Sequence, residues 1–137
     1  MTSTRIWRLV AFAFLMFIVL VAVLADMERM PEIFSALSDY PGGDKVGHFG
    51  LYGMLAFLGG KAWRRPIRLA RLPLAAGVLP AVSLATLEEV SQLFFAGRTA
   101  DWLDLGAGFL GVGVAVLLVT VGPLRNRLRT SPGQALT

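Results

Sequence analysis

The stretch IWRLVAFAFLMFIVLVAVLA, residues 6–25, decides the fold of this chain. Its one charged residue, Arg8, lies near the start. About 20 residues of α-helix are needed to cross a hydrocarbon core that is ~30 Å thick. The stretch therefore predicts a transmembrane helix over residues 6–25.

The composition of the whole chain agrees with a membrane environment. Hydrophobic residues make up 55% of the 137 residues and charged residues only 16%, and the mean hydropathy is +0.66. In a soluble globular domain about a quarter of the residues are charged, so the polar surface here is too small to cover one. We therefore expect an integral membrane protein.

Three further apolar runs predict helices over residues 46–63, 72–95 and 103–122. The last run is nearly free of charge, whereas the other two carry polar side chains near one end. Pro80 lies inside the third run and is expected to kink that helix. We predict an all-α fold, a single domain over residues 1–137 that forms a bundle of four transmembrane helices.

Small residues recur on two of the predicted helices. Ala107, Gly111 and Ala115 stand four residues apart in the last helix, and the second helix contains Gly50, Gly53, Gly59 and Gly60. In lipid, small residues allow helix backbones to approach closely. The pattern therefore predicts tight packing by the second and fourth helices.

The basic residues are distributed unevenly between the two sides of the predicted bundle. One side holds ten of the thirteen Lys and Arg residues: Arg5, Arg8, Lys61, Arg64, Arg65, Arg68, Arg71, Arg125, Arg127 and Arg129. The nine acidic residues lie on the other side or at the membrane edge that faces it. Because cytoplasmic segments are enriched in Lys and Arg, both termini are predicted to be cytoplasmic, with an outer loop over 26–45 and a basic inner loop over 61–71.

Several segments allow more than one interpretation. The first helix, with basic residues before it, also fits a cleavable signal peptide, although its apolar part is longer than the usual 7–15 residues or so. Residues 31–38 of the outer loop form either a short helix or a plain loop.

The basic inner loop either sets the topology or also contacts anionic headgroups. The tail, 130–137, is expected to be disordered. Membrane lipids are expected partners and nucleic acid is not, because the basic residues adjoin apolar spans.

Polar residues gather in the outer half of the predicted bundle. Asp44, His48 and Tyr52 are spaced i, i+4 and i+8, which places them within about 80° of one helix face. An ionisable group inside a membrane costs several kcal/mol unless it faces protein, water or a partner, so we expect the polar residues to cluster. The candidate site consists of Asp44, Lys45, His48, Tyr52, Glu88, Glu89, Gln92, Arg98, Asp101 and Asp104.

Individual members of this set have more than one possible role. His48, the only histidine, is either a packing residue or a general base that a carboxylate holds, and Asp44 lies one turn before it. Glu88 or Glu89 would then help it to activate water. Asp104 suits the first turn of the fourth helix as an N-terminal cap. With one His and no Cys, no zinc site and no cofactor are predicted, although a hard cation among Asp44, Glu88 and Glu89 stays open.

Two blocks, DKVGHFGLY at residues 44–52 and EEVSQLFFAGRTADWLDLGAGFLG at residues 88–111, resemble the VanZ-like family of small bacterial membrane proteins. The family pattern is Asp-Lys-x-x-His, then Glu-x-x-Gln, then Arg, then Asp-x-x-x-Asn-x-x-Gly. The matching residues are Asp44, Lys45, His48, Glu89, Gln92, Arg98, Asp104 and Gly111. Gly108 stands where the family has Asn, so a hydrogen bond from that Asn would have to come from water or from Asp101 here. The match extends over roughly 26–121.

The resemblance implies a multi-helix protein of the bacterial plasma (inner) membrane, and it links the chain to low-level resistance to teicoplanin-type glycopeptides. The first hypothesis is a cell-envelope protein whose outer face binds a lipid-linked precursor or another anionic ligand, with Lys45 and Arg98 contacting phosphate or carboxylate. The second is an intramembrane hydrolase that uses His48. The third is a structural protein whose polar residues hold the helices together and which binds another membrane protein.

Overall fold

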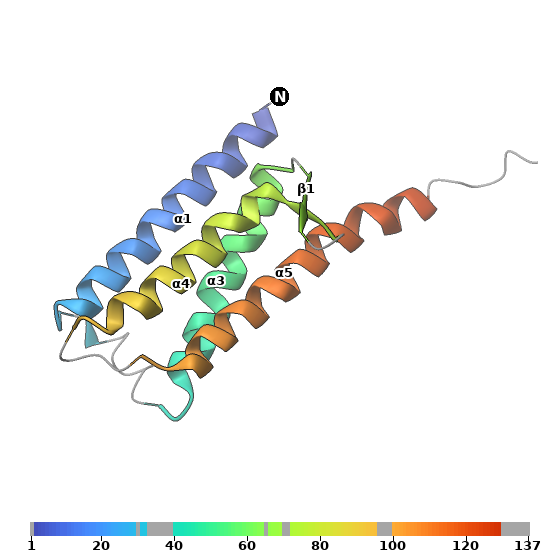
Figure 1. Ribbon diagram of the computed structural model, residues 1–137. Coiled ribbons are helices and arrows are strands. Elements are labelled where there is room, and N and C mark those ends of the chain that lie inside the picture. The colour runs from blue at the N-terminus through green and yellow to red at the C-terminus, as the bar shows by residue number, and fades with distance from the viewer. Residues whose placement is uncertain are drawn as a thin grey trace, which may run out of the picture.

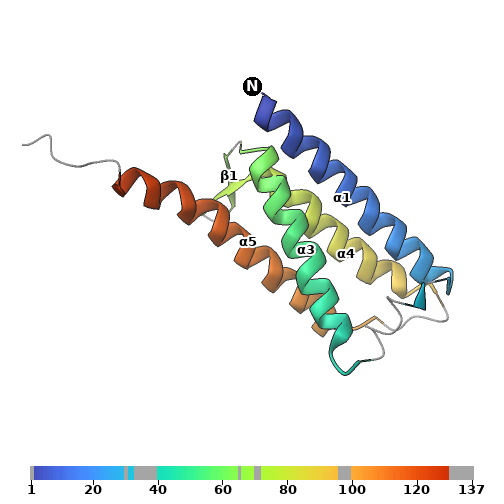
Figure 2. The ribbon, with the colours of Figure 1, turned by 180° about the vertical axis from the view of Figure 1, so that it is seen from behind.

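The computed structural model describes residues 2–29, 31–32, 40–64, 66–69, 72–95 and 100–129. Four helices form a bundle in this part of the chain: α1 (Thr2–Asp26), α3 (Gly43–Ala62), α4 (Leu79–Gln92) and α5 (Trp102–Arg129). In both views α3 and α4 lie between α1 and α5 (Figure 1, Figure 2). The predicted helical architecture is confirmed. Arg98, residues 33–38 and the tail 130–137 lie outside the described residues.

A short hairpin separates α3 from α4. Strand β1 (Pro66–Leu69) pairs antiparallel with β2 (Leu72–Ala75), with Ile67 opposite Leu74. A 3-10 turn, Ala76–Val78, then leads into α4. The prediction of a helix from residue 72 is therefore wrong, because backbone pairing with β1 uses the first residues of the apolar run.

Pro80 does not kink α4, contrary to the prediction. The helix begins at Leu79, so Pro80 lies in its first turn. Backbone N–H groups in the first turn have no carbonyl partner within the helix, and a proline there removes no hydrogen bond. Pro80 therefore marks the start of α4.

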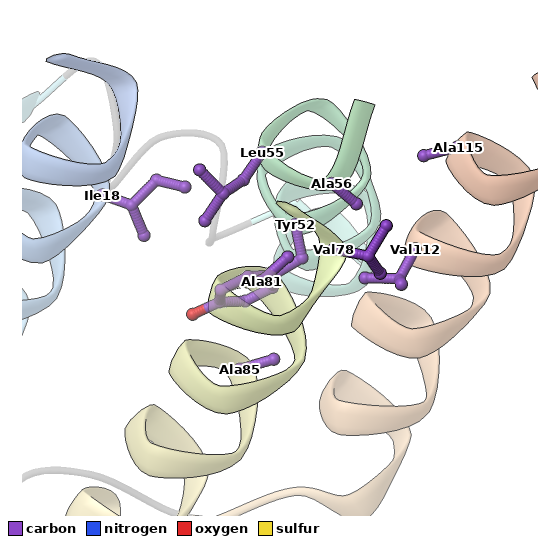
Figure 3. Packing of buried hydrophobic residues seen from close by; sticks show 9 residues of the cluster. All are labelled: Ile18, Tyr52, Leu55, Ala56, Val78, Ala81, Ala85, Val112 and Ala115. Atoms are coloured by element: carbon purple, nitrogen blue, oxygen red, sulfur yellow. The ribbon is translucent and has the colours of Figure 1, made fainter. Parts of the chain in front are cut away.

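The core of the bundle is built around α3. Tyr52 and Leu55 of α3 are almost completely buried, and Ile18 reaches them from α1. Ala85 of α4 and Val112 of α5 close the cluster (Figure 3). Because Ile18 is only 1% exposed, α1 is a packed part of this fold, and cleavage after α1 would uncover the core.

Two pairs of glycines set the closest approaches between elements. A Cβ atom on Gly77 of the 3-10 turn would lie 1.9 Å from the carbonyl oxygen of Gly59. On α5, a Cβ on Gly111 would lie 2.2 Å from the carbonyl oxygen of Phe49, and Gly53 lies directly against Gly111. Only glycine fits such backbone contacts, so the predicted tight packing of α3 and α5 is confirmed.

Two of the described helices are long and apolar enough to cross a membrane: Ser3–Asp26 of α1 and Trp102–Thr120 of α5. In the apolar 18-residue segment of each helix, only 11% of the residues of α1 and 22% of those of α5 are buried. A core helix of a soluble protein would be mostly buried, because a helix that is apolar all round has to be covered. The low burial therefore favours lipid around these two helices.

Candidate functional site

Eight of the predicted site residues lie together at the end of the bundle where α3 and α5 begin and α4 ends. We call this group the polar cluster: Lys45, His48, Tyr52, Glu88, Glu89, Gln92, Asp101 and Asp104. Asp44 is exposed and makes no ion pair with another described residue. The tenth predicted residue, Arg98, is outside the described part of the chain.

Lys45 joins the first turn of α3 to the start of α5. Its Nζ donates to Asp101 Oδ2 at 2.8 Å and to Asp104 Oδ1 at 3.0 Å. The hydrogen bond from Lys45 holds the pKa of Asp101 below its ordinary value, and the two carboxylates raise the pKa of Lys45. Lys45, which was predicted to contact an anionic ligand, therefore already has two carboxylate partners.

His48 lies between carboxylates of two other helices. Its Nε2 is 3.7 Å from Glu88 Oε2 on α4, and its Nδ1 is 3.8 Å from Asp104 Oδ2 on α5. Both separations exceed hydrogen-bond length, and Nδ1 is buried without a hydrogen-bond partner among the described residues. The carboxylates near the ring come from α4 and α5, whereas Asp44, one turn before His48 in the sequence, is exposed.

Tyr52 connects the histidine to α4. Its ring is stacked on His48 with centroids 5.8 Å apart and planes 11° from parallel, and its hydroxyl donates a hydrogen bond to Glu88. Glu88 is therefore the carboxylate shared by His48 and Tyr52. Between the two glutamates considered as partners of His48, the geometry favours Glu88.

Glu89 has a different position from Glu88, although they are neighbours in sequence. One turn of helix is 3.6 residues, so adjacent side chains point about 100° apart. Glu89 is 5% exposed and accepts a hydrogen bond from the backbone N–H of Asp101. Glu89 thereby ties the end of α4 to the start of α5, and Gln92, one turn later, is buried beside it.

Asp101, and not Asp104, caps α5. The backbone N–H of Leu103 donates to Asp101 Oδ1 at 2.8 Å, which is the bond that an N-cap side chain accepts. The side chain of Asp104 is 12% exposed and faces Lys45 and His48 instead. The sequence contained a signal for this cap, since Asp101 lies two residues before the apolar run over 103–122.

Gly108 lies against the ring of Tyr52. A Cβ atom at residue 108 would be 3.1 Å from Tyr52 Cδ2, which is tighter than ordinary van der Waals contact. An asparagine at this position would therefore push against the ring.

The polar cluster carries more negative than positive charge among its described members. Four carboxylates face one lysine and one histidine. No three His, Asp or Glu residues in the described ranges are arranged to hold a metal ion. The arrangement is suited to accept a proton at His48, which two carboxylates would stabilise, and to cross-link three helices.

No protein-family model, curated protein sequence or solved structure matches this chain.

Proposed function

We propose that this protein is a VanZ-like integral membrane protein of the bacterial plasma membrane in which all four helices lie in the bilayer. Large apolar side chains exposed on the two shorter helices support this proposal. Val46 and Met54 of α3 are 66% and 49% exposed, and Leu87 of α4 is 63% exposed. Large contiguous apolar surfaces are uncommon on soluble monomers, and α3 lies between the two helices that are long enough to span (Figure 1).

The proposed orientation has the polar cluster outside the cell and both termini in the cytoplasm. Arg5 and Arg8 lie at the start of α1, and Lys61 and Arg64 lie at and after the end of α3. These positions share one end of the bundle, opposite to the polar cluster (Figure 1). The enrichment of Lys and Arg on cytoplasmic segments supports this orientation.

The function we propose is binding of an envelope ligand, a lipid-linked precursor or another anion, at the outer end of the bundle. One observation carries it: residues from the two separate motif blocks meet in one cluster, as the contacts Tyr52–Glu88 and Lys45–Asp104 show. Because Lys45 is already paired with carboxylates, the proposal assigns the contact with an anion to Arg98. Reduced access of glycopeptides to the envelope is the expected consequence.

Replacement of Arg98 by alanine tests this function. Arg98→Ala should abolish a change in teicoplanin susceptibility that wild-type expression causes, while the amount of protein in the membrane stays the same. Arg29→Ala is the matched control, because Arg29 is an exposed arginine of the predicted outer loop and lies outside both motif blocks. Full retention of the susceptibility change by the Arg98 variant would contradict ligand binding through this arginine.

A second candidate function is structural, with the protein acting by binding another membrane protein. The hydrogen bonds that tie the polar cluster together favour it, since they join α3 to α4, α4 to the start of α5, and α3 to α5. Under this function Lys45→Ala should lower the amount of folded protein, and crosslinking in membranes should capture a neighbour. Under ligand binding, Arg98→Ala should change susceptibility without lowering the amount of protein.

A further inference from the structure

A basic pocket lies at the end of the bundle opposite to the polar cluster. It is a hollow of about 560 Å³ between the start of α1 and the end of α3. Three cations and two hydroxyl groups are among the residues that line it: Arg8, Lys61, Arg64, Ser3 and Thr4. No acidic residue lines the pocket in the described part of the chain, so no carboxylate there neutralises its positive charge.

An apolar groove of about 300 Å³ runs along the outside of α3 and α5. Phe49, Met54 and Phe57 of α3 form one wall, and Val114 and Leu118 of α5 form the other. The floor consists of the glycines at which the two helix backbones touch. In a bilayer such a groove faces acyl chains and is filled by them.

Phe57 connects the pocket and the groove. Its ring lines the groove, while the Lys61 ammonium lies 5.3 Å above the ring centroid. Trp7, which lines the basic pocket, meets Phe57 edge-on with centroids 6.5 Å apart. The basic pocket and the apolar groove therefore adjoin at the ring of Phe57.

We infer that the pocket and the groove together bind one anionic phospholipid. Its phosphate lies in the basic pocket, where Arg8, Lys61 and Arg64 neutralise the charge, and one acyl chain lies in the groove beyond Phe57. Basic pockets between transmembrane helices recognise anionic headgroups in this way, and arginine is well suited to phosphate oxygens. A soluble anion would leave the groove unused, and an apolar helix from a partner protein would leave the cations unmatched.

This inference rests on the proposed function in one respect, the placement of the bundle in lipid. It does not depend on ligand binding at the polar cluster, because it concerns the opposite end of the molecule and holds for either orientation in the bilayer. It requires only that the bundle lies in lipid. The full chain, purified in a mild detergent, is titrated with dioleoylphosphatidylglycerol or dioleoylphosphatidylcholine, and bound lipid is counted by native mass spectrometry. Phosphatidylglycerol should bind more tightly than phosphatidylcholine with the same acyl chains.

Charge variants test the basic pocket. Lys61→Gln and Arg64→Gln should each weaken phosphatidylglycerol binding by about fivefold, the effect expected for one basic residue at an anionic lipid surface. Arg5→Gln is the matched control, since Arg5 is exposed at the same end and does not line the pocket. Equal weakening by Arg5→Gln, or equal binding of the two lipids to the wild type, would overturn the inference.

A groove variant separates a lipid from a free phosphate. Gly50 lines the groove, and a Cβ atom added to it meets nothing within 4 Å, so Gly50→Leu fills the groove without disturbing the backbone. It should weaken phosphatidylglycerol binding severalfold, whereas Gly113→Leu, also in open space but outside the groove, should not. If Gly50→Leu has no effect while inorganic phosphate displaces the lipid, the pocket binds a soluble anion and the inference is wrong.

Discussion

At the scale of single residues, Tyr52 has the largest number of roles in the polar cluster. Tyr52 is 1% exposed, its ring stacks on His48, and the ring leaves little room for a side chain at Gly108. Its hydroxyl donates to Glu88, so a carboxylate that is only 11% exposed has a donor. Burying a charged group without such donors is costly, which explains why a large polar residue occupies the centre of an otherwise apolar core.

The Lys45–Asp101 contact predicts a dependence of stability on pH. The pKa of Asp101 is lowered from 3.8. Its contribution to the free energy of unfolding is therefore present above about pH 4 and is lost as the pH falls through its folded-state pKa. The pKa of Lys45 is raised from 10.5, so its contribution is present below that pH and is lost only as the pH rises through the higher folded-state pKa. Between these limits the contact is intact.

We therefore expect Lys45→Met to lower the midpoint of thermal unfolding at pH 7 in detergent. The difference from the wild type should shrink as the pH falls below about 4, because protonation of Asp101 removes the contact from the wild type as well. Lys61→Met is the control, since Lys61 makes no ion pair with a described carboxylate. A difference that stays constant from pH 7 to pH 3 would show that Lys45 does not stabilise the fold through its contact with Asp101.

At the scale of elements, the register between α3 and α5 depends on glycine. Gly111 touches the backbone at Phe49 and lies against Gly53. These contacts set the depth of α5 relative to α3 and therefore bring Asp104 level with Lys45 and His48. The helix packing and the polar cluster are thus coupled.

Two glycine substitutions on the same helix should have opposite effects. Gly111→Ala should lower stability by several kcal/mol, because its Cβ would lie 2.2 Å from a backbone oxygen that cannot move without separating the helices. Gly113→Ala should be neutral or stabilising by up to about 1 kcal/mol, because its Cβ meets nothing within 4 Å and alanine favours the helix. Thermal unfolding of both variants checks this, and equal effects would contradict the packing described for α5.

At the scale of the whole molecule, charge distinguishes the two ends. The polar cluster, with Asp101 and Asp104, lies at one end, and Arg8, Lys61 and Arg64 line a pocket at the other. Between them the helices expose mainly apolar side chains, such as Leu9 and Leu110. This distribution matches a bilayer, which has two polar surfaces and an apolar interior.

The absence of cysteine makes the proposed orientation easy to measure. In intact cells, a membrane-impermeant maleimide should label Asp44→Cys, which is exposed at the polar end. Arg64→Cys, exposed at the basic end, should be labelled only after the cells are permeabilised. Labelling of Arg64→Cys in intact cells, with Asp44→Cys protected, would mean that the bundle is inserted the other way.

The sequence by itself determined the helical class of the fold and the chemical groups available to the candidate site. The length of the apolar runs predicted four helices, and the cost of ionisable groups in lipid predicted that the polar residues would cluster. Both predictions depend on local sequence and on the solvent, so no knowledge of packing was needed. The hairpin was missed because the apolar residues of β2 have no periodicity that separates a buried strand from a helix.

Only the tertiary structure decided which polar groups meet. Helical spacing placed Asp44, His48 and Tyr52 on one face, but the exposed position of Asp44 and the carboxylates around His48 depend on how α4 and α5 are rotated and at what depth they pack. That geometry is set by contacts distant in sequence, such as Phe49 with Gly111. Helical periodicity specifies which residues share a face of one helix, but it carries no information about the helix that packs against that face. For this physical reason the sequence predicted the residues of the cluster and only the tertiary structure decided their contacts.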